Sequence, residues 1–219
     1  EMLRSLVGSE MCIRDRYSTL LGSDNVSALT IASFVGRDLV SRRGSGTPIA
    51  AFVSEMNNLA RSLRMTKTRF TAPHGLDAGN AVSTSCALDM ALLGMYSMQN
   101  PAFCYIVSQA SRRIGVQSQT KGTTMYDISN NNKMMSTPGV DGIKAGSSRA
   151  AGQCLLLSAT RNAIARRSPQ TGTEVIYPQR MIIAVLGTGE RYSLARQMLN
   201  TGWRVWENWQ ASGMDMKDP

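Results

Sequence analysis

Two nearly continuous apolar runs late in the chain constrain its fold more than any other feature. They occupy residues 153–159 and 181–186 of the 219-residue sequence. Alternate side chains of a strand point to opposite faces of its sheet, so a strand that is apolar throughout must be covered on both faces. The sequence therefore predicts a sheet in which these two segments are central strands with structure packed on either side.

Two helices are predicted in the first third of the chain. Residues 26–40 form an apolar, helix-compatible run for which Ser23 or Asp24 is the expected cap. Thr47-Pro48 begins a second helix, because proline is favoured at the first helical position. Apolar residues at three- and four-residue spacing give this second helix one buried face: Ile49, Phe52, Val53, Met56, Leu59, Ala60 and Leu63.

Two further helices are predicted later in the chain. Ser83 or Thr84 is the expected cap of a third helix, which Asn100-Pro101 ends. Residues 192–209 are amphipathic and form the last helix.

Between these helices the sequence favours strands. The short strand-like runs lie at residues 105–107, 114–117 and 125–128. Residues 161–179 are polar and rich in turn formers, and we interpret them as an extended hairpin loop. Helices first, antiparallel strands next and a final helix together indicate an α+β domain, with an antiparallel sheet flanked by helices.

The composition is that of a basic globular chain. The net charge is +9, but the arginines are scattered and are not interleaved with aromatic residues, so we expect a basic solvated surface and no nucleic-acid partner. No apolar run approaches the ~20 residues of a membrane span. The four cysteines show no CxxC spacing and no histidine partner, so we expect no metal and no cofactor, and we interpret the cysteines as small core residues.

The two ends of the chain differ from the rest. The string LRSLVGSEMCIRDR within residues 1–16 resembles the translation of a sequencing adapter carried into an assembled gene. We therefore expect the natural sequence to begin near Tyr17 and residues 211–219 to be a frayed tail. The domain is predicted to span residues 17–210 and to be incomplete at its N-terminus.

Two short motifs carry the candidate chemistry. Ser23-Asp24-Asn25 is a Ser-x-Asn triplet, and Lys144-Ala145-Gly146 lies in a strand that should be accessible at an edge. A glycine beside a lysine lets a ligand approach the strand closely, while the ammonium meets a carboxylate or an oxyanion. Alone, such triplets are mostly helix caps and turn lysines. In this order they suggest a site that cleaves amides through an acyl-serine.

Longer blocks around these motifs make a resemblance specific. FVSEMNNLARSLRMTKTRFTAPHGLD, residues 52–77, resembles the block FVxxMNxxAxxLGMxxTxFxxPHGLD of the serine-type D-Ala-D-Ala carboxypeptidases, the low-molecular-mass penicillin-binding proteins of peptidase family S11. Residues 83–91 are similar to their STAxDMA helix start, residues 130–146 to their N-x-N…G-V-D-G-x-K-T-G segment, and residues 151–155 to their AGxCL strand. The resemblance runs from about Leu20 to Trp203 and implies a β-lactamase/DD-peptidase-like fold.

The resemblance implies a role for each matching residue. An upstream serine would attack the carbonyl of the penultimate D-Ala, and a lysine three positions later would take its proton. Ser23 would relay a proton to the leaving D-Ala amine, and Asn25 would bind the substrate backbone. Lys144 would supply positive potential for the terminal carboxylate. Gly146 would allow close approach, and the backbone N–H of Ser147 would be one donor of the oxyanion hole.

Two departures from the family pattern bear on activity. Ala145 stands where the family has threonine, so the hydroxyl that meets the substrate carboxylate is absent. Either Ser147 or Ser148 substitutes for it, or carboxylate binding is weaker by roughly 1–2 kcal/mol. No serine before Ser23 has a lysine three positions later, so the acylating serine is missing from this sequence. We therefore predict that the chain as given is inactive and is not labelled covalently by penicillin.

Other residues invite a catalytic interpretation that their context disfavours. Ser118 and Lys121 form a Ser-x-x-Lys spacing, but on a strand their side chains would point to opposite faces. His74 is the only histidine, and in Pro-His-Gly-Leu-Asp we expect a buried, hydrogen-bonded structural residue. Asp77 is interpreted as a carboxylate that fixes the same loop.

The sequence thus predicts a fragment of a D-Ala-D-Ala carboxypeptidase that trims peptidoglycan stem peptides, binds β-lactam antibiotics and works in the periplasm or extracytoplasmic envelope. Membrane association of the full-length parent stays open. One alternative is a β-lactamase-like hydrolase, but none of Glu55, Glu174 and Glu190 has the asparagine four residues on that its deacylating loop needs. The other is a noncatalytic peptidoglycan- or penicillin-binding scaffold, which Lys-Ala-Gly mildly favours.

Overall fold

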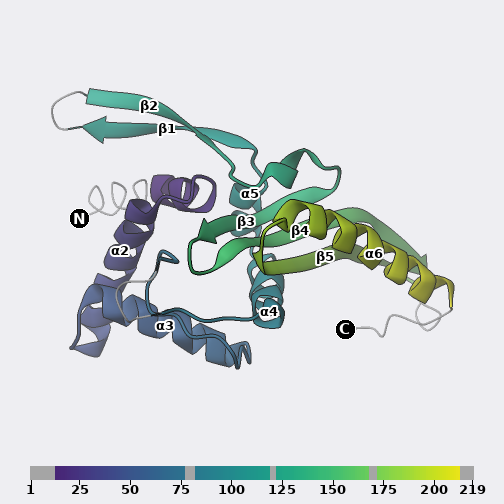
Figure 1. Cartoon of the computed structure of the whole chain (residues 1–219), viewed down its shortest axis with the longest axis horizontal. Helices are drawn as coiled ribbons and strands as arrows, with labels where there is room; N and C mark the ends of the chain where they lie inside the picture. The colour runs from purple at the N-terminus through teal and green to yellow at the C-terminus, as the bar shows by residue number, and fades with distance from the viewer. Residues whose placement is uncertain (1–12, 77–81, 119–121, 168–171, 213–219) are drawn as a thin grey trace.

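Helices precede strands along the chain, and one long helix closes it (Figure 1). The computed structural model describes residues 13–76, 82–118, 122–167 and 172–212. Residues 13–20 are helical. The other helices are α2 (Asn25–Arg43), α3 (Pro48–Ser62), α4 (Ala87–Ser97), α5 (Pro101–Val107) and α6 (Arg191–Ala211). The strands are β1 (Ser111–Ser118), β2 (Gly122–Ser129), β3 (Val140–Ser148), β4 (Gly152–Arg167) and β5 (Glu174–Thr188). The predicted α+β class is confirmed.

Strand β4 lies at the centre of a three-stranded antiparallel sheet with the order β3-β4-β5. One face of the sheet packs against α6 through Leu155, Leu157, Ile183, Val185, Leu199 and Trp203. The other face packs towards α4 and α5 through Ile143, Leu156, Ala184, Met98 and Val107. Both apolar runs are therefore covered on two faces, as predicted. The run at 181–186 nevertheless belongs to β5, an edge strand of the sheet that the described residues form, so its predicted central position is wrong.

Helices α2 and α3 lie side by side, apart from the sheet (Figure 1). The Asp24 carboxylate caps α2 by accepting hydrogen bonds from the backbone N–H groups of Val26 and Ser27, which selects Asp24 over Ser23 as the cap. Pro48 occupies the first position of α3, as predicted. Gly36 permits the close packing of the two helices, because a Cβ atom there would lie 1.9 Å from the Pro48 carbonyl oxygen.

Strands β1 and β2 form a hairpin that projects from the rest of the molecule (Figure 1). These strands contain the predicted runs at 114–117 and 125–128. The base of the hairpin is held by Ile114, which packs with Tyr17, Leu21 and Ile106 in a small separate core.

The prediction of a strand at residues 105–107 is wrong, because these residues end helix α5. The Asn100 side chain caps this helix by accepting from the N–H groups of Ala102 and Phe103, and Pro101 takes the first helical position. Asn100-Pro101 thus begins a helix, whereas α4 already ends at Ser97. Burial of Val107, which is fully enclosed, outweighs the strand preference of this β-branched residue.

The prediction of an extended loop at residues 161–179 is also wrong. Strands β4 and β5 continue as a two-stranded ribbon beyond the core, with Ile164 paired to Tyr177 and Arg167 to Glu174. A ribbon exposed on both faces needs no apolar alternation, so its polar sequence resembled that of a loop. The tip at 168–171 lies outside the described residues.

The predicted cap of α4 is a further correction. Thr84 pairs instead with Arg69 in an antiparallel bridge, through two backbone hydrogen bonds of 2.9 Å. The Ser83 hydroxyl accepts from the Thr71 N–H at 3.1 Å. Because both residues hold this bridge, α4 starts only at Ala87, with Cys86 at its cap and no side-chain capping bond.

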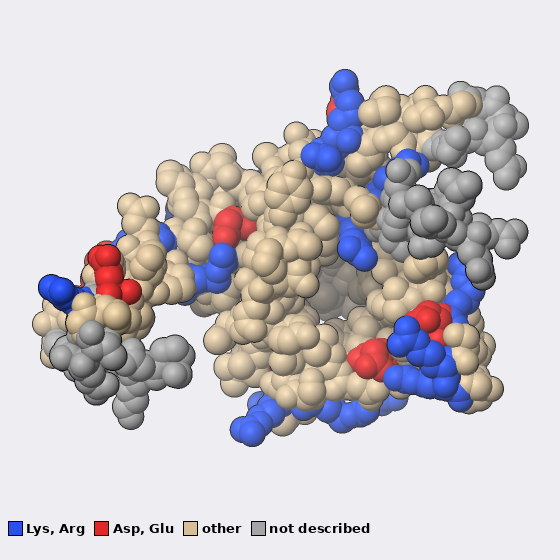
Figure 2. Space-filling model, turned by 180° about the vertical axis from the view of Figure 1, so that it is seen from behind, with Lys and Arg blue, Asp and Glu red and all other residues tan. Residues whose placement is uncertain are grey.

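The surface of the protein is basic, and its positive charges are dispersed. Lys and Arg side chains are spread over the face in Figure 2 and do not gather into one patch. Within the described ranges, none of the helices combines the length and apolarity required to cross a bilayer.

Candidate active site

A groove of about 560 Å³ lies between the start of α2, the loop at 70–76 and the edge strand β3. Every residue that the sequence singled out for the site lines this groove: Ser23, Asn25, Lys144, Ala145, Gly146 and Ser147. Since Ser23 and Lys144 are 121 positions apart, folding brings together two motifs that are remote in sequence. Their roles stay predictions, but their meeting in one groove is a property of the fold.

Ser23 occupies a strained backbone position between the first helix and α2. Its φ of 60° lies in the left-handed region, which is rare for residues other than glycine and is often found at functional sites. Asn131 holds this turn by donating from Nδ2 to the carbonyl of Gly22 at 2.9 Å and to Ser23 Oγ at 3.3 Å. Asn25 follows as the first residue of α2 and is half-buried. The Asp24 cap and the Asn131 amide therefore fix the direction of the Ser23 hydroxyl.

Lys144 crosses the groove from β3 and donates a hydrogen bond from Nζ to Ser23 Oγ. The same amine donates to the carbonyl of Ala145 at 2.7 Å. Burial lowers the pKa of Lys144 to about 8, and the positive charge of Arg191 adds to this effect. A serine hydroxyl thus contacts an amine that changes its protonation state near physiological pH, and such a pair can pass a proton between groups bound in the groove.

Arg191 is a site residue that the sequence reasoning missed. It is the first residue of α6, and its Nη1 donates to the carbonyl of Gly146 at 2.6 Å. Its guanidinium lies 4.8 Å from the centre of the Tyr192 ring. Arginines are common in this basic chain, so sequence alone gave no reason to single this one out. The fold places a second positive charge beside β3.

Neighbouring asparagines connect the two walls of the groove. Asn131 contacts the Ser23 turn, and the Asn132 amide, which is only 1% exposed, donates to the carbonyl of Gly142 at 3.3 Å. Asn130 donates to the carbonyls of Val107 and Gln109. The sequence showed this triplet only as part of a family segment, and the structure shows that it holds β3 against the helices.

The side chains at the end of β3 differ in exposure. The Ala145 methyl is 3% exposed and packs in the core on the α6 side, although the residue borders the groove. Ser147 is exposed, whereas Ser148 uses its hydroxyl to accept from the Ala151 N–H at 3.0 Å. Of the two serines that were candidates to replace the missing threonine hydroxyl, Ser147 is therefore the less committed.

His74 lines the groove and is half-buried, so the prediction of a buried histidine is wrong. The prediction that it is hydrogen-bonded is confirmed, because its Nδ1 accepts from the Leu76 N–H at 3.2 Å. Ser118 lies on the β1–β2 hairpin and is absent from the residues that line the groove. Asp77 and Lys121 lie outside the described residues.

The sequence is similar to proteins of known family. A sequence model of the family described as D-alanyl-D-alanine carboxypeptidase matches residues 3–168. D-alanyl-D-alanine carboxypeptidase DacC of Escherichia coli (strain K12) is 27% identical over 208 residues, which cover 91% of this chain and 43% of that protein. The D-alanyl-D-alanine carboxypeptidase of Streptomyces sp. (strain K15) is 28% identical over 163 residues, covering 71% of this chain and 53% of that protein.

Solved structures show the same fold. The Streptomyces K15 DD-transpeptidase superposes with a TM-score of 0.69 at 24% identity, covering 87% of this chain and 67% of that chain. Penicillin-binding protein D2 of Listeria monocytogenes, in its ampicillin-bound form, superposes with a TM-score of 0.61 at 25% identity, covering 88% of this chain and 67% of that chain. The fold is therefore that of the DD-peptidases and penicillin-binding proteins. The family match spans most of the sequence, and the chain belongs to the D-alanyl-D-alanine carboxypeptidase family. It spans less than half the length of DacC.

Proposed function

We propose that this chain supplies the proton-relay and carboxylate-binding walls of an active site that removes the terminal D-Ala from peptidoglycan stem peptides. The contact between Ser23 Oγ and Lys144 Nζ across the groove carries the proposal. The acylating serine comes from sequence upstream of this chain, in a longer protein of the cell envelope.

In this mechanism the upstream serine gives its proton to the lysine three positions later, and its oxygen attacks the carbonyl carbon of the penultimate D-Ala. The C–N bond to the terminal D-Ala breaks, and an acyl-serine ester forms. Ser23 passes a proton to the departing amine and is reprotonated from Lys144. Water then hydrolyses the ester and regenerates the serine.

Positive charge at the end of β3 accounts for the choice of a substrate with a free carboxylate. Lys144 and Arg191 both lie at this strand, and Ser147 offers an exposed hydroxyl beside them. A β-lactam also carries a carboxylate beside a reactive amide, so we propose that it occupies the same groove.

Two alternatives, a β-lactamase and a noncatalytic scaffold, are distinguished by the carboxylates in the groove and by Ala145. Of the described carboxylates only Asp24 lines the groove, and it is committed to capping α2, so the described residues offer no deacylating base for a β-lactamase. A noncatalytic binding scaffold gains support from the missing hydroxyl at Ala145.

The test is D-Ala release from a pentapeptide that ends in D-Ala-D-Ala, by protein whose natural sequence before Tyr17 has been restored from the genomic DNA. We expect release, with Ser23→Ala and Lys144→Met slowing it by roughly 100-fold or more. Lys133→Met, which changes an exposed lysine, is the control. Binding of the peptide without release would instead identify a scaffold.

A further inference from the structure

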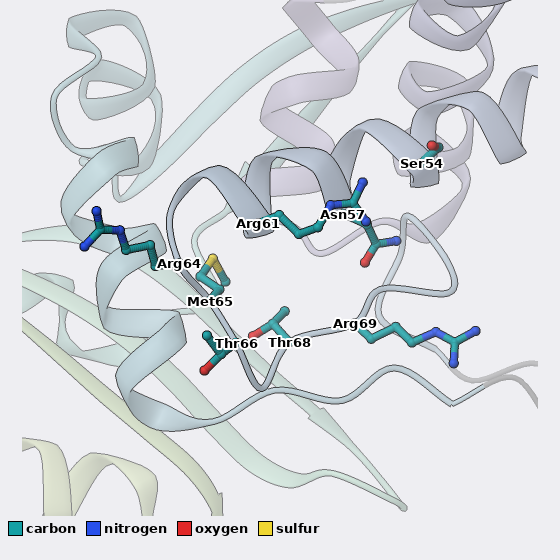
Figure 3. A pocket seen from close by; sticks show the side chains of 8 residues that line it. All are labelled: Ser54, Asn57, Arg61, Arg64, Met65, Thr66, Thr68 and Arg69. Carbon is teal, nitrogen blue, oxygen red and sulfur yellow. The ribbon is translucent and has the colours of Figure 1, made fainter.

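A second groove lies between α3 and the segment that follows this helix. We call it the arginine groove. Its lining residues are Ser54, Asn57, Arg61, Arg64, Met65, Thr66, Thr68 and Arg69, and its volume is about 550 Å³. It shares no lining residue with the candidate active site. In Figure 3, Arg61 lies along α3 beside Asn57, while the Arg64 and Arg69 side chains point outward at opposite ends of the groove.

The backbone around the arginine groove is held firmly. Asn57 donates to the carbonyl of Phe70 at 2.8 Å and accepts from the Phe70 N–H at 2.8 Å. Buried Asp89 accepts from the Lys67 N–H and from the Thr68 hydroxyl, both at 2.8 Å. The Arg69 backbone pairs with Thr84. These backbone and side-chain hydrogen bonds therefore preorganise the groove.

The basic side chains of this groove have no acidic partners. Within the described part of the chain, no carboxylate forms an ion pair with Arg61, Arg64 or Arg69. Arg61 donates only to the neutral side chain of Asn58. Glu55, the acid on α3, pairs with Arg43, and Asp89 is engaged by the loop. The C-terminal end of α3 contributes roughly half a negative charge, which three guanidinium groups outweigh.

Arg64 provides an independent observation. Its φ is 58°, in the left-handed region that L-residues other than Asn and Asp rarely adopt. The family block that residues 52–77 resemble has glycine at this position, which would adopt this conformation without strain. An exposed arginine held in an unfavourable conformation suggests that its side chain is used.

We propose that the arginine groove binds an extended polyanion that carries several phosphate groups. Arginine forks suit phosphate oxygens, and three guanidinium groups spread over the length of a groove match a chain of anions better than one ion. The hydroxyls of Thr66 and Ser54 add donors along the same path.

The test measures binding of short-chain linear polyphosphate to the chain by calorimetry, with orthophosphate for comparison. We expect polyphosphate to bind more tightly than orthophosphate, with an affinity that falls as salt increases. Arg64→Gly should weaken binding roughly tenfold, the effect of losing one charge-assisted contact. The same variant should raise Tm by about 2–4 °C, because glycine relieves the backbone strain.

Arg204→Gln on α6 is the matched control, since it removes one exposed positive charge elsewhere. Equal weakening by Arg64→Gly and Arg204→Gln would overturn the proposal and show general attraction to a basic protein. Unchanged binding by Arg64→Gly would overturn it as well. Arg64-dependent binding to phosphatidylglycerol vesicles, with no binding to polyphosphate, would also overturn the proposal and identify a membrane surface as the ligand.

Discussion

At the residue scale, the contact of Lys144 with Ser23 defines the candidate site. The sequence singled out both residues, because the family blocks around them are long and specific. It could not predict Arg191, since the contact between α6 and the end of β3 depends on packing that no local pattern encodes. The position of His74 was missed for a similar reason, because its half-exposed place in the groove depends on the approach of β3.

Burial of Lys144 should make stability depend on pH. A lysine whose pKa falls to about 8 on folding, from an ordinary 10.5, holds its proton less tightly when folded than when unfolded. Below about pH 8 the buried ammonium therefore lowers stability, and this cost disappears as pH rises from 8 to 10.5. We expect the free energy of unfolding, measured with urea, to increase across this interval by up to about 3 kcal/mol.

Lys144→Met isolates this effect from other titrating groups. The variant should be more stable than the parent below pH 8, and the difference should vanish towards pH 10.5. Lys133→Met should not change the pH profile, because this lysine is exposed. A Lys144→Met profile parallel to that of the parent would show that Lys144 keeps its ordinary pKa in the folded protein.

Asp24 offers a second test at this scale. Hydrogen bonds from the Ser27 hydroxyl and then from the Ser27 N–H hold the pKa of Asp24 below its ordinary value. Its contribution is thus complete above pH 3.8 and is lost as pH falls through the lower folded value. We expect Asp24→Ala to cost about 1 kcal/mol of unfolding free energy near neutral pH. An unchanged free energy of unfolding in Asp24→Ala would show that this cap does not stabilise α2.

At the element scale, capping and periodicity predicted helices and core strands well. Thr47-Pro48 placed the start of α3, and the apolar runs gave β4 and β5. The errors at 105–107 and 161–179 share a cause, because both segments depend on what lies next to them. Val107 is helical because the Asn100 cap and the surrounding core favour helix α5. The polar β4–β5 ribbon is held by strand pairing along its length.

The close packing of α2 against α3 should make the protein sensitive to a larger side chain at Gly36. A methyl group at Gly36 would meet the Pro48 backbone carbonyl, which cannot move without displacing α3. We expect Gly36→Ala to cost about 3 kcal/mol of unfolding free energy, because the backbone overlap is severe. Gly44→Ala, at a position with open space but a left-handed φ of 78°, is the comparison and should cost about 1 kcal/mol. Thermal denaturation of both variants would rank them, and equal costs would contradict the close approach.

At the scale of the whole molecule, a helical wall and a sheet edge meet to form one groove. The helices carry the hydroxyl of Ser23 and the amide of Asn25, and β3 carries the amine of Lys144. Asn131 and Asn132 tie the two parts together. Sequence predicted this arrangement through resemblance to a family, while the connecting hydrogen bonds became visible only in the folded chain.

Covalent labelling with a fluorescent penicillin tests the central claim most directly. The account predicts no label on the present chain, and labelling of the protein restored with an upstream Ser-x-x-Lys motif. Replacement of Lys144 by Met in the restored protein should slow labelling by roughly 100-fold or more. Label on the present chain, or equally fast labelling without Lys144, would contradict the account.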